Sequence, residues 1–339
     1  MPRFANKLER ALVATWYGKR RPPFGLQLLS YVFRGASALR RAGYRRGLLP
    51  SRRLAAPVVV VGNITAGGSG KTPFTIWLAR ALRERGIRPG IVTRGYGGQA
   101  RYWPRDVTPA SAAAEVGDEA VLLARATQCP VVAGPDRAAA AARLVDNESV
   151  DVIIADDGLQ HYGLARDFEI ATIDGERGLG NGWLLPAGPL REPAARLDQV
   201  DCIVIKGDAS HFALAGALSM TLDLSVARSL ADESARPLES FRDSTVHAVA
   251  GIGHPEQFFA MLRERGLDVI AHPFPDHAAL DIEDVAFSDD LPVLMTEKDA
   301  VKFPAVDDER LWTVPAEARL PQAEAEDLLA RIAGLVRVK

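Results

Sequence analysis

Residues 58–72 decide the fold, and they read Val58-Val59-Val60-Val61-Gly62-Asn63-Ile64-Thr65-Ala66-Gly67-Gly68-Ser69-Gly70-Lys71-Thr72. The four valines predict a buried strand, the glycines predict a tight turn, and a helical pattern runs from Phe74 to Arg85 directly after them. A phosphate-binding P-loop needs this order, because backbone N–H groups of the turn surround phosphate oxygens and the helix N-terminus favours negative charge. The segment therefore predicts a nucleotide-binding protein.

The residue types inside this loop suggest how each would serve a nucleotide. Lys71 would reach the β- and γ-phosphates, and the Thr72 hydroxyl would bind Mg²⁺. Thr65 stands where the usual P-loop pattern has its first glycine. The alternative is a glycine-rich turn with an unrelated Lys-Thr pair, which the flanking strand and helix disfavour. We expect nucleotide contacts from Thr65, Gly67, Gly68, Ser69, Gly70, Lys71 and Thr72.

The overall composition is ordinary for a globular protein with sizeable cores, at 47% hydrophobic and 25% charged residues. A length of 339 residues suggests about two domains. Cys129 and Cys202 are far apart in sequence, which argues against a disulfide framework or a zinc site and fits a reducing cytoplasm. No apolar stretch reaches the ~18 residues that a membrane-spanning helix needs.

Strand and helix patterns alternate along most of the chain. Strand patterns fall at 58–61, 91–93, 131–133, 152–155, 169–173 and 202–206. Helical patterns fall between several of them, at 74–85, 118–125 and 137–146. This alternation predicts an α/β fold with a doubly wound parallel sheet of the P-loop NTPase type, whose ligands lie beyond the carboxyl ends of the strands.

A second, smaller α/β series follows a loosely patterned stretch after Ala209. Its strand patterns fall at 246–250, 269–271 and 293–296, and a helical pattern covers 256–265. We therefore divide the chain into three parts. They are a basic amphipathic N-terminal helical segment (1–50), a P-loop nucleotide-binding domain (51–225) and a smaller C-terminal α/β domain (226–339).

Positive charge is concentrated at the N-terminus. Residues 1–53 contain 13 Lys and Arg residues and one acid, Glu9, which leaves 28 basic and 42 acidic residues for the rest of the chain. The two parts therefore carry formal charges of +12 and −14. Apolar residues recur in this segment at helical spacing, and Pro22-Pro23 divides it into a predicted helical hairpin. These residues are Leu8, Leu12 and Trp16, then Leu28, Leu29, Val32, Phe33, Ala36 and Leu39.

Basic amphipathic helices of this kind suit an anionic membrane surface, where each basic residue contributes about 1 kcal/mol. Three alternatives stay open: an RNA-binding arm, which would need no apolar stripe; a stripe that packs on the protein's own core; and a signal peptide ending at Ala36-Ser37-Ala38. The signal peptide is disfavoured because its apolar region is short, contains Gln27 and Ser30, and is separated from that site by Arg34.

An apolar run at 152–155 ends in Asp156 and Asp157. This pattern is typical of the strand whose terminal carboxylate holds Mg²⁺ beside a P-loop. Adjacent residues of a strand point to opposite faces, so we expect one of the two aspartates to contact the ion. A strand followed by an ordinary Asp-Gly turn is the alternative.

Other polar residues are candidates on local grounds. Asp118 opens a helix, where a capping or first-turn role is the simplest interpretation. Arg191 lies in a proline-flanked loop, and His277 belongs to the cluster Phe274-Pro275-Asp276-His277. Further candidates for contact with phosphate or substrate, each with a structural or surface-turn alternative, are Arg94, Tyr96, Glu119, Gln160 and His161.

Seven motifs, in this order, resemble one family: the tetraacyldisaccharide 4'-kinases of lipid A biosynthesis in Gram-negative bacteria. They are Val-Gly-Asn (61–63) with Gly-Gly-Ser-Gly-Lys-Thr-Pro (67–73), Thr-Arg-Gly-Tyr-Gly (93–97), Val-Gly-Asp-Glu-Ala (116–120), Asp-Asp-Gly-Leu-Gln-His (156–161), Leu-Leu-Pro-Ala-Gly-Pro-Leu-Arg-Glu (184–192), Phe-Pro-Asp-His (274–277) and Thr-Glu-Lys-Asp-Ala-Val-Lys (296–302). The resemblance extends from the basic segment to about Lys302. That family also lacks the first P-loop glycine, so Thr65 does not count against it.

The resemblance implies an ATP- and Mg²⁺-dependent kinase that phosphorylates the 4'-hydroxyl of a tetraacylated glucosamine disaccharide 1-phosphate to give lipid IVA. It makes Asp118 the general base, His277 the residue that tunes this base from the second domain, and Arg191 the cation that stabilises the transferring phosphoryl group. The expected partners are the acylated substrate and an anionic inner-membrane surface, with the protein peripheral or monotopic on the cytoplasmic face. No nucleic acid and no obligate protein partner is expected.

Two other classes of protein stay open. A P-loop GTPase or metallochaperone-like switch protein would share the loop and the sheet, and Thr296-Glu297-Lys298-Asp299 resembles the guanine-reading Thr-Lys-x-Asp with its lysine one place late. A preference for guanine over adenine would favour that class. A nucleic-acid-dependent ATPase would use the basic segment, and salt-sensitive stimulation by RNA would identify it.

Overall fold

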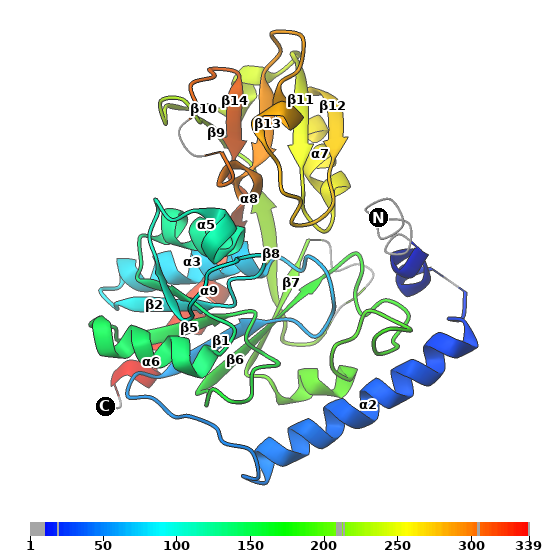
Figure 1. Ribbon diagram of the computed structural model, residues 1–339, viewed down its shortest axis with the longest axis vertical. Coiled ribbons are helices and arrows are strands. Elements are labelled where there is room, and N and C mark those ends of the chain that lie inside the picture. Colours follow the sequence, from blue (N-terminus) through cyan, green and yellow to red (C-terminus); the bar gives the residue numbers. More distant parts are fainter. Residues whose placement is uncertain (1–10, 19, 208–211, 213, 304–305, 338–339) are drawn as a thin grey trace.

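The computed structural model describes residues 11–18, 20–207, 212, 214–303 and 306–337. Two β-sheets stand one above the other, and a long helix runs along the side of the lower one (Figure 1). The lower sheet carries the P-loop segment, and the upper sheet belongs to the C-terminal part of the chain. No helix among the described residues is long and apolar enough to cross a membrane.

The lower sheet has nine strands in the order β15-β8-β7-β6-β1-β5-β2-β4-β3. Seven of them, from β8 to β4, pair in parallel, while β3 and β15 are antiparallel edge strands. The predicted doubly wound parallel sheet is therefore confirmed. The strands are β1 (Val58–Gly62), β2 (Pro89–Thr93), β3 (Arg105–Val107), β4 (Val131–Ala133), β5 (Val152–Asp156), β6 (Phe168–Asp174), β7 (Cys202–Lys206), β8 (Leu218–Asp223) and β15 (Glu317–Arg319).

Helices cover both faces of this sheet, which explains why its central strands are apolar without alternation. In β1, Val59 and Val61 pack into the core formed with α3, α5 and α9, whereas Val58 and Val60 pack into the core beside α6. The helices are α3 (Lys71–Glu84), α4 (Ala113–Val116), α5 (Asp118–Thr127), α6 (Arg137–Asn147) and α9 (Gln322–Arg337), with the short 3-10 helix η1 (Ala194–Gln199).

The upper sheet has six strands in the order β10-β9-β14-β13-β11-β12. The four strands from β14 to β12 are parallel, and β9 and β10 add an antiparallel edge. The elements are β9 (Val226–Ser229), β10 (Ala235–Pro237), η2 (Leu238–Phe241), β11 (Thr245–Ala250), α7 (Pro255–Glu264), β12 (Asp268–Pro273), η3 (Ile282–Val285), β13 (Val293–Thr296), α8 (Glu297–Ala300) and β14 (Leu311–Val314).

The domain division at 226–339 needs one correction at its C-terminal end. β15 pairs with β8, and Leu328, Leu329 and Ile332 of α9 are buried in the core of the lower sheet. Residues 317–337 thus return to the P-loop domain, because the apolar face of α9 fits that sheet. The chain crosses between the domains twice, through β8–β9 and β14–β15. We call these paired strands the crossover ribbon, since Asp223 pairs with Glu317 on the lower side of the boundary and Arg228 pairs with Thr313 on the upper side.

The N-terminal segment forms two helices in its described part, at 11–17 and as α2 (Phe24–Arg45), separated by Pro22-Pro23 as predicted. Residues 1–10, with Leu8, lie outside the described residues. α2 rests on the P-loop domain through Ser30, whose hydroxyl donates to the Leu184 carbonyl at 2.8 Å, and through Phe33.

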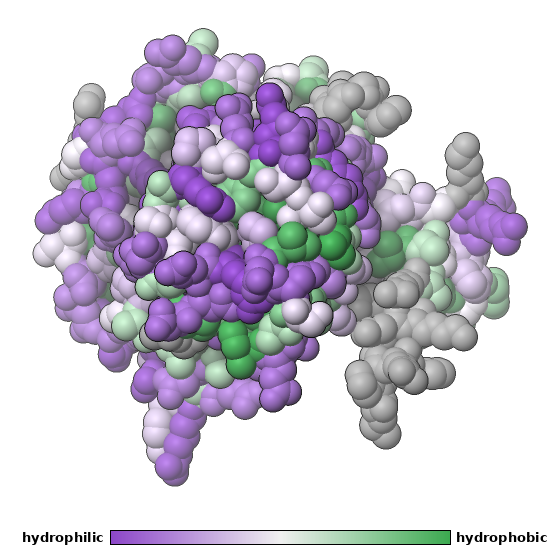
Figure 2. All heavy atoms as spheres, turned by 90° about the horizontal axis from the view of Figure 1, so that it is seen from above, coloured by the Kyte–Doolittle hydropathy of each residue, from purple (hydrophilic) through white to green (hydrophobic). Residues whose placement is uncertain are grey.

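The outer side of α2 is apolar and exposed. Phe24 is 79% exposed, Leu28 57%, Val32 65% and Leu39 76%. The alternative in which this stripe packs on the protein's own core is therefore wrong for Leu28, Val32 and Leu39. Viewed from above the upper domain, by contrast, the surface is mainly hydrophilic, with apolar residues in smaller patches (Figure 2).

Candidate active site

The P-loop connects the end of β1 to the start of α3. Gly70 precedes α3 with φ +79, and a Cβ there would lie 2.9 Å from Lys206 Cδ, so glycine is required for both reasons. The Ser69 hydroxyl is 2.8 Å from that of Thr172 on β6. Thr65 is buried and paired with Leu190, so the 184–192 loop fixes the start of the P-loop.

A cavity of about 420 Å³ lies between the two domains, and the P-loop forms one wall of it. The other walls come from the carboxyl ends of the lower strands and from α7, α8 and the loop before His277. Its polar and charged lining residues outside the P-loop are Thr93, Arg94, Tyr96, Glu119, Asp157, Arg191, Lys206, His254, Gln257, Asp276, His277, Thr296, Glu297 and Lys298. Its apolar end is formed by Leu222, Leu224, Ile252, Phe258, Met261, Val314 and Ala316.

Three charged side chains meet at the P-loop end of this cleft. Arg191 Nη1 donates to Asp157 Oδ1 at 3.1 Å, and Lys71 Nζ lies 3.7 Å from the same oxygen. Burial alone would raise the pKa of Asp157, but the charges of Lys71 and Arg191 outweigh it and hold this pKa well below its usual range. The arrangement places two cations and one ionised carboxylate where a P-loop binds phosphate.

Asp156 and Asp157 have different surroundings. Asp156 ends β5, is 1% exposed, and accepts a 2.8 Å hydrogen bond from the Thr75 hydroxyl of α3. Burial, followed by the charges of Glu119 and Asp157, raises the pKa of Asp156 to about 7. Asp157 lies beyond the strand with φ +50 and lines the cleft. The strand therefore ends between the two aspartates instead of presenting both on its faces.

The donor set at this end of the cleft fits Mg²⁺ better than a transition metal. Oxygen ligands are available from the Thr72 hydroxyl and from Asp156 or Asp157, and Mg²⁺ in nucleotide sites is bound by one or two carboxylates together with substrate phosphates. Within the described ranges no group of three or more His, Cys, Asp or Glu side chains could hold a metal by itself. A Mg²⁺ ion here would share its coordination with the nucleotide.

Asp118 of the lower domain contacts His277 of the upper domain; His277 lines the cleft, whereas Asp118 is buried behind it and is not among the lining residues. His277 Nδ1 lies 3.1 Å from Asp118 Oδ2, and its ring is 4.5 Å from that of Tyr96. Lys298 Nζ donates to Asp276 Oδ1 at 2.7 Å and lies 3.2 Å from His277 Nε2.

The pKa values of the two partners move in opposite directions. Burial would raise the pKa of Asp118, but the hydrogen bond from His277 and the charge of Lys298 lower it below its usual value. Burial would lower the pKa of His277, but its hydrogen bond to Asp118 raises it overall. An ionised carboxylate paired with a histidine is suited to accept a proton from a hydroxyl group.

The secondary candidates divide into two groups. Arg94, Tyr96 and Glu119 line the cleft, whereas Gln160 and His161 do not. Gln160 Nε2 donates to the Asn63 carbonyl at 3.0 Å, which is a structural contact. Burial and the nearby charges of Arg137 and Arg94 lower the pKa of His161 to about 4, so this side chain is neutral at pH 7.

Several residues in the cleft or close behind it stand in no motif that the sequence would single out. Lys206 ends β7 and Gln257 lies on α7, and neither belongs to a polar cluster that would single it out. Thr75, the partner of Asp156, follows Thr72 by three positions on α3, and this helical spacing was the one available signal. Arg137 is 1% exposed, and its Nη2 donates to the Asp156 carbonyl at 3.5 Å.

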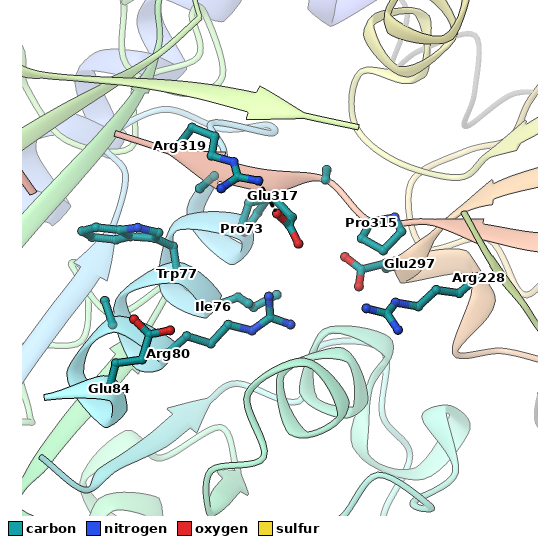
Figure 3. Close-up of a pocket in the computed structure, with 13 residues that line it drawn as sticks. Pro73, Ile76, Trp77, Arg80, Glu84, Arg228, Glu297, Pro315, Glu317 and Arg319 are labelled. Carbon is teal, nitrogen blue, oxygen red and sulfur yellow. Dashed lines mark hydrogen bonds and ion pairs between the residues drawn. The ribbon is translucent and has the colours of Figure 1, made fainter. Parts of the chain in front are cut away.

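A second cavity of about 280 Å³ lies beside the crossover ribbon, where Pro73, Glu297 and Ala316 separate it from the cleft. Arg80 of α3 and Arg228 of β9 point toward each other across it, and the Glu297 carboxylate lies close to Arg228 (Figure 3). Burial raises the pKa of Glu297 despite these arginines. Charged groups of both signs line this cavity, so it offers no net charge to attract an ion.

Comparison with known proteins identifies what this chain is similar to. A family model described as tetraacyldisaccharide-1-P 4'-kinase (LpxK) matches residues 23–333. A tetraacyldisaccharide 4'-kinase from Alkalilimnicola ehrlichii is 50% identical over 331 residues, which cover 96% of this chain and 97% of the relative. One from Nitrosococcus oceani is 48% identical over 315 residues, covering 93% and 92%. A crystal structure of LpxK from Aquifex aeolicus in complex with ATP matches with a TM-score of 0.78 and 29% identity, over 91% of this chain and 97% of that one.

Proposed function

This chain belongs to the tetraacyldisaccharide-1-P 4'-kinase family, and we propose that it transfers the γ-phosphate of ATP to the 4'-hydroxyl of a tetraacyldisaccharide 1-phosphate, the lipid A precursor. One observation carries the proposal. The P-loop of the first domain and His277, which contacts Asp118, line the same cavity, so a phosphate donor and a hydroxyl acceptor can meet there beside Asp118. Bringing donor and acceptor together in this way supplies a large part of the rate enhancement of phosphoryl transfer.

The P-loop end of the cleft is the proposed triphosphate site. Backbone N–H groups of residues 67–72 bind the phosphate oxygens, and Lys71 neutralises their charge. The Thr72 hydroxyl and Asp156 or Asp157 would hold Mg²⁺, which would supply further charge neutralisation. Arg191 stabilises the negative charge on the transferring phosphoryl group, a role worth about 10³–10⁵ in rate in related P-loop enzymes.

Asp118 is the proposed general base. It accepts the proton of the 4'-hydroxyl while that oxygen forms a bond to the γ-phosphorus, and the bond from phosphorus to the β–γ bridging oxygen breaks to release ADP. His277 keeps Asp118 ionised and oriented through the 3.1 Å contact, and the charge of Lys298 also favours the ionised carboxylate. The low pKa of Asp118 fits a base that is ready at neutral pH.

The outer face of α2 is the proposed membrane contact, on the cytoplasmic face of the inner membrane. Six large hydrophobic side chains of α2 are more than half exposed, and Arg34 and Arg40 of the same helix are also exposed. Apolar side chains that enter the acyl boundary, together with basic groups near anionic headgroups, are what holds an interfacial helix. The acyl chains of the substrate would then stay in the bilayer while its sugar reaches the cleft.

A single labelling experiment tests the proposal. The protein is incubated with γ-labelled ATP and total inner-membrane lipid, and the lipid products are separated. We expect the label in a disaccharide lipid, and no transfer with Lys71→Ala. A preference for GTP without lipid labelling would indicate a switch protein instead, and RNA-stimulated ATP hydrolysis would indicate a nucleic-acid-dependent ATPase.

A further inference from the structure

A second set of polar contacts joins the two domains on the β7 side of the cleft. Lys206 is 5% exposed, and its Nζ lies 2.8 Å from Asp174 Oδ2 on the neighbouring strand β6. The same Nζ donates at 2.8 Å to Gln257 Oε1 on α7, which belongs to the upper domain. β7 and β2 lie on opposite sides of β1 in the sheet, so this contact is on the other side of the P-loop from Asp118.

The Lys206–Gln257 contact also reaches the P-loop itself. The aliphatic part of Lys206 lies against Gly70, where an added Cβ would be 2.9 Å from Lys206 Cδ. The loop before α7 approaches the P-loop as well, because a Cβ on Gly253 would be 3.4 Å from the Gly68 nitrogen. Lys206 therefore contacts the P-loop, the lower sheet and the upper domain, and helps set the spacing between them.

That spacing matters for the proton acceptor, since Asp118 and His277 come from different domains. Glu119 lies with Asp118 on the lower domain, whereas Asp276 and Lys298 lie with His277 on the upper domain. Lys298 Nζ is 2.7 Å from Asp276 and 3.6 Å from Glu119, so these charges also meet across the cleft. A displacement that moves the His277 loop away from the lower domain would lengthen the Asp118–His277 contact.

We propose that the Lys206–Gln257 contact is a positioning device that holds the upper domain where His277 stays within hydrogen-bond distance of Asp118. The inference rests on the proposed function, in which this pair accepts the proton of the substrate hydroxyl. Lys206 and Gln257 act through the placement of α7, and neither takes part in the proton transfer.

Gln257 is the better of the two residues to change. Removing Lys206 would leave the Asp174 carboxylate buried without its partner, which can unfold the protein. Gln257→Leu removes a neutral acceptor at similar volume and leaves the Lys206–Asp174 pair intact. Gln257→Glu keeps an oxygen for Lys206 and is the conservative variant. Glu256→Leu, at the exposed neighbouring position of α7, controls for an added leucine.

The test compares these three variants with the wild-type protein. The imidazole of His277 is titrated by NMR without nucleotide or lipid, with His277→Ala to assign its signal. With Gln257→Leu we expect the pKa of His277 to fall toward its ordinary value, because the contact with Asp118 is lost. The pKa of Asp118 rises for the same reason, so the acid limb of the kcat–pH profile moves to higher pH. kcat falls about tenfold while ATP affinity stays unchanged, in line with small displacements of reacting groups.

Gln257→Glu should restore the wild-type titration and most of kcat, and Glu256→Leu should match the wild type in every measurement. A His277 titration that Gln257→Leu leaves unchanged overturns the proposal, whether or not its melting temperature falls. Weaker ATP binding with kcat preserved also overturns it, since Gln257 would then serve the nucleotide. The histidine titration needs no turnover, so a wild-type protein without lipid kinase activity would contradict the proposed function and leave this test valid.

Discussion

Asp118 makes two contacts that suit two different roles, one in the helix and one in catalysis. It is the first residue of α5, where its Oδ1 accepts the Glu119 backbone N–H at 2.8 Å, and its carboxylate also contacts His277 of the other domain. The contact with Glu119 fits the structural role at the start of the helix that the local sequence suggests. The contact with His277 fits the catalytic role that the family resemblance implies. Measurements of rate and stability can separate the two roles.

Asp118→Asn should lower kcat by at least ~10²-fold, the low end of general base catalysis, because an amide cannot accept the proton. It keeps a side-chain oxygen and nearly the same shape, so the melting temperature should change little. Steady-state kinetics and thermal denaturation check both expectations. A lower melting temperature with kcat preserved would make Asp118 a helix cap only.

His277→Ala should reduce kcat less than Asp118→Asn does and should change its pH dependence. The hydrogen bond from His277 lowers the pKa of Asp118, so this pKa rises when the imidazole is removed. The base must be ionised to act, and activity is therefore lost at a higher pH as the solution is acidified. The kcat–pH profile of the variant checks this shift, and an acid limb at the wild-type position would contradict the pairing.

Lys71→Ala should abolish phosphoryl transfer without unfolding the protein. The Lys71 side chain is 14% exposed and lines the cleft beside Asp157, so it is not part of a hydrophobic core. Such cations contribute orders of magnitude to the rate. Activity assays and circular dichroism measure the two effects, and more than about a tenth of the wild-type rate would contradict the assignment.

Asp156 and Asp157 show what the sequence alone cannot predict about single residues. The apolar run before Asp156 identifies the strand, and the P-loop identifies its purpose. The end of the strand between Asp156 and Asp157 could not be read from the pattern, because it depends on the positive φ of Asp157 and on the Thr75 hydroxyl. The Asp118–His277 contact came from the resemblance, since 159 positions separate the two residues in sequence.

At the scale of elements, the exposed apolar side of α2 can be tested as a membrane contact. Replacing Leu28, Val32 and Leu39 with serine should release the protein from anionic vesicles, because each large apolar side chain contributes about 1.5–3 kcal/mol when it leaves water. The three side chains are exposed, so the melting temperature should stay the same. Vesicle sedimentation measures the binding.

The matched control replaces exposed apolar residues far from α2. Ile270 is 40% exposed and Ile282 46% exposed in the upper domain, and serine at both positions should leave vesicle binding intact. Equal binding of the α2 variant and the wild type would place the membrane contact elsewhere.

Glu297 at the start of α8 links pH to stability. Burial raises the pKa of Glu297, so the folded state prefers the protonated carboxyl. The protonated group contributes its full stability below the ordinary glutamate pKa. That stability is lost as the pH rises through the pKa that Glu297 has in the folded state. Glu297→Gln should therefore raise the melting temperature at pH 8, and the gain should shrink toward pH ~4. Thermal denaturation across this range checks the sign, and a gain that is independent of pH would contradict the explanation.

Elements whose sequence has a strong hydrophobic pattern can be predicted, whereas elements with a weak pattern cannot. The valine run of β1 and the helical patterns of α3, α5 and α6 identify those elements within a few residues. β15 has three residues and pairs with β8, which lies far earlier in the sequence, so no local pattern marks it. The sequence therefore does not predict that the chain returns to the lower sheet through β15 and α9.

At the scale of the whole molecule, the active site is a property of two domains. The P-loop, Asp118 and Arg191 belong to the lower domain, and His277, Lys298 and Gln257 belong to the upper one. The sequence locates each group on its own domain, yet the distances between them depend on how the domains meet. The Lys206–Gln257 contact is an example, since neither residue stands in a recognisable motif.

The crossover ribbon limits how the domains can move. Its two strands pair on both sides of the boundary, Asp223 with Glu317 and Arg228 with Thr313. A two-stranded ladder bends more readily than it slides, because sliding breaks its hydrogen bonds. We therefore expect the upper domain to swing toward the P-loop more readily than it slides along it. A swing about the ribbon would change the Asp118–His277 and Lys206–Gln257 contacts together, because both join the upper domain to the lower one.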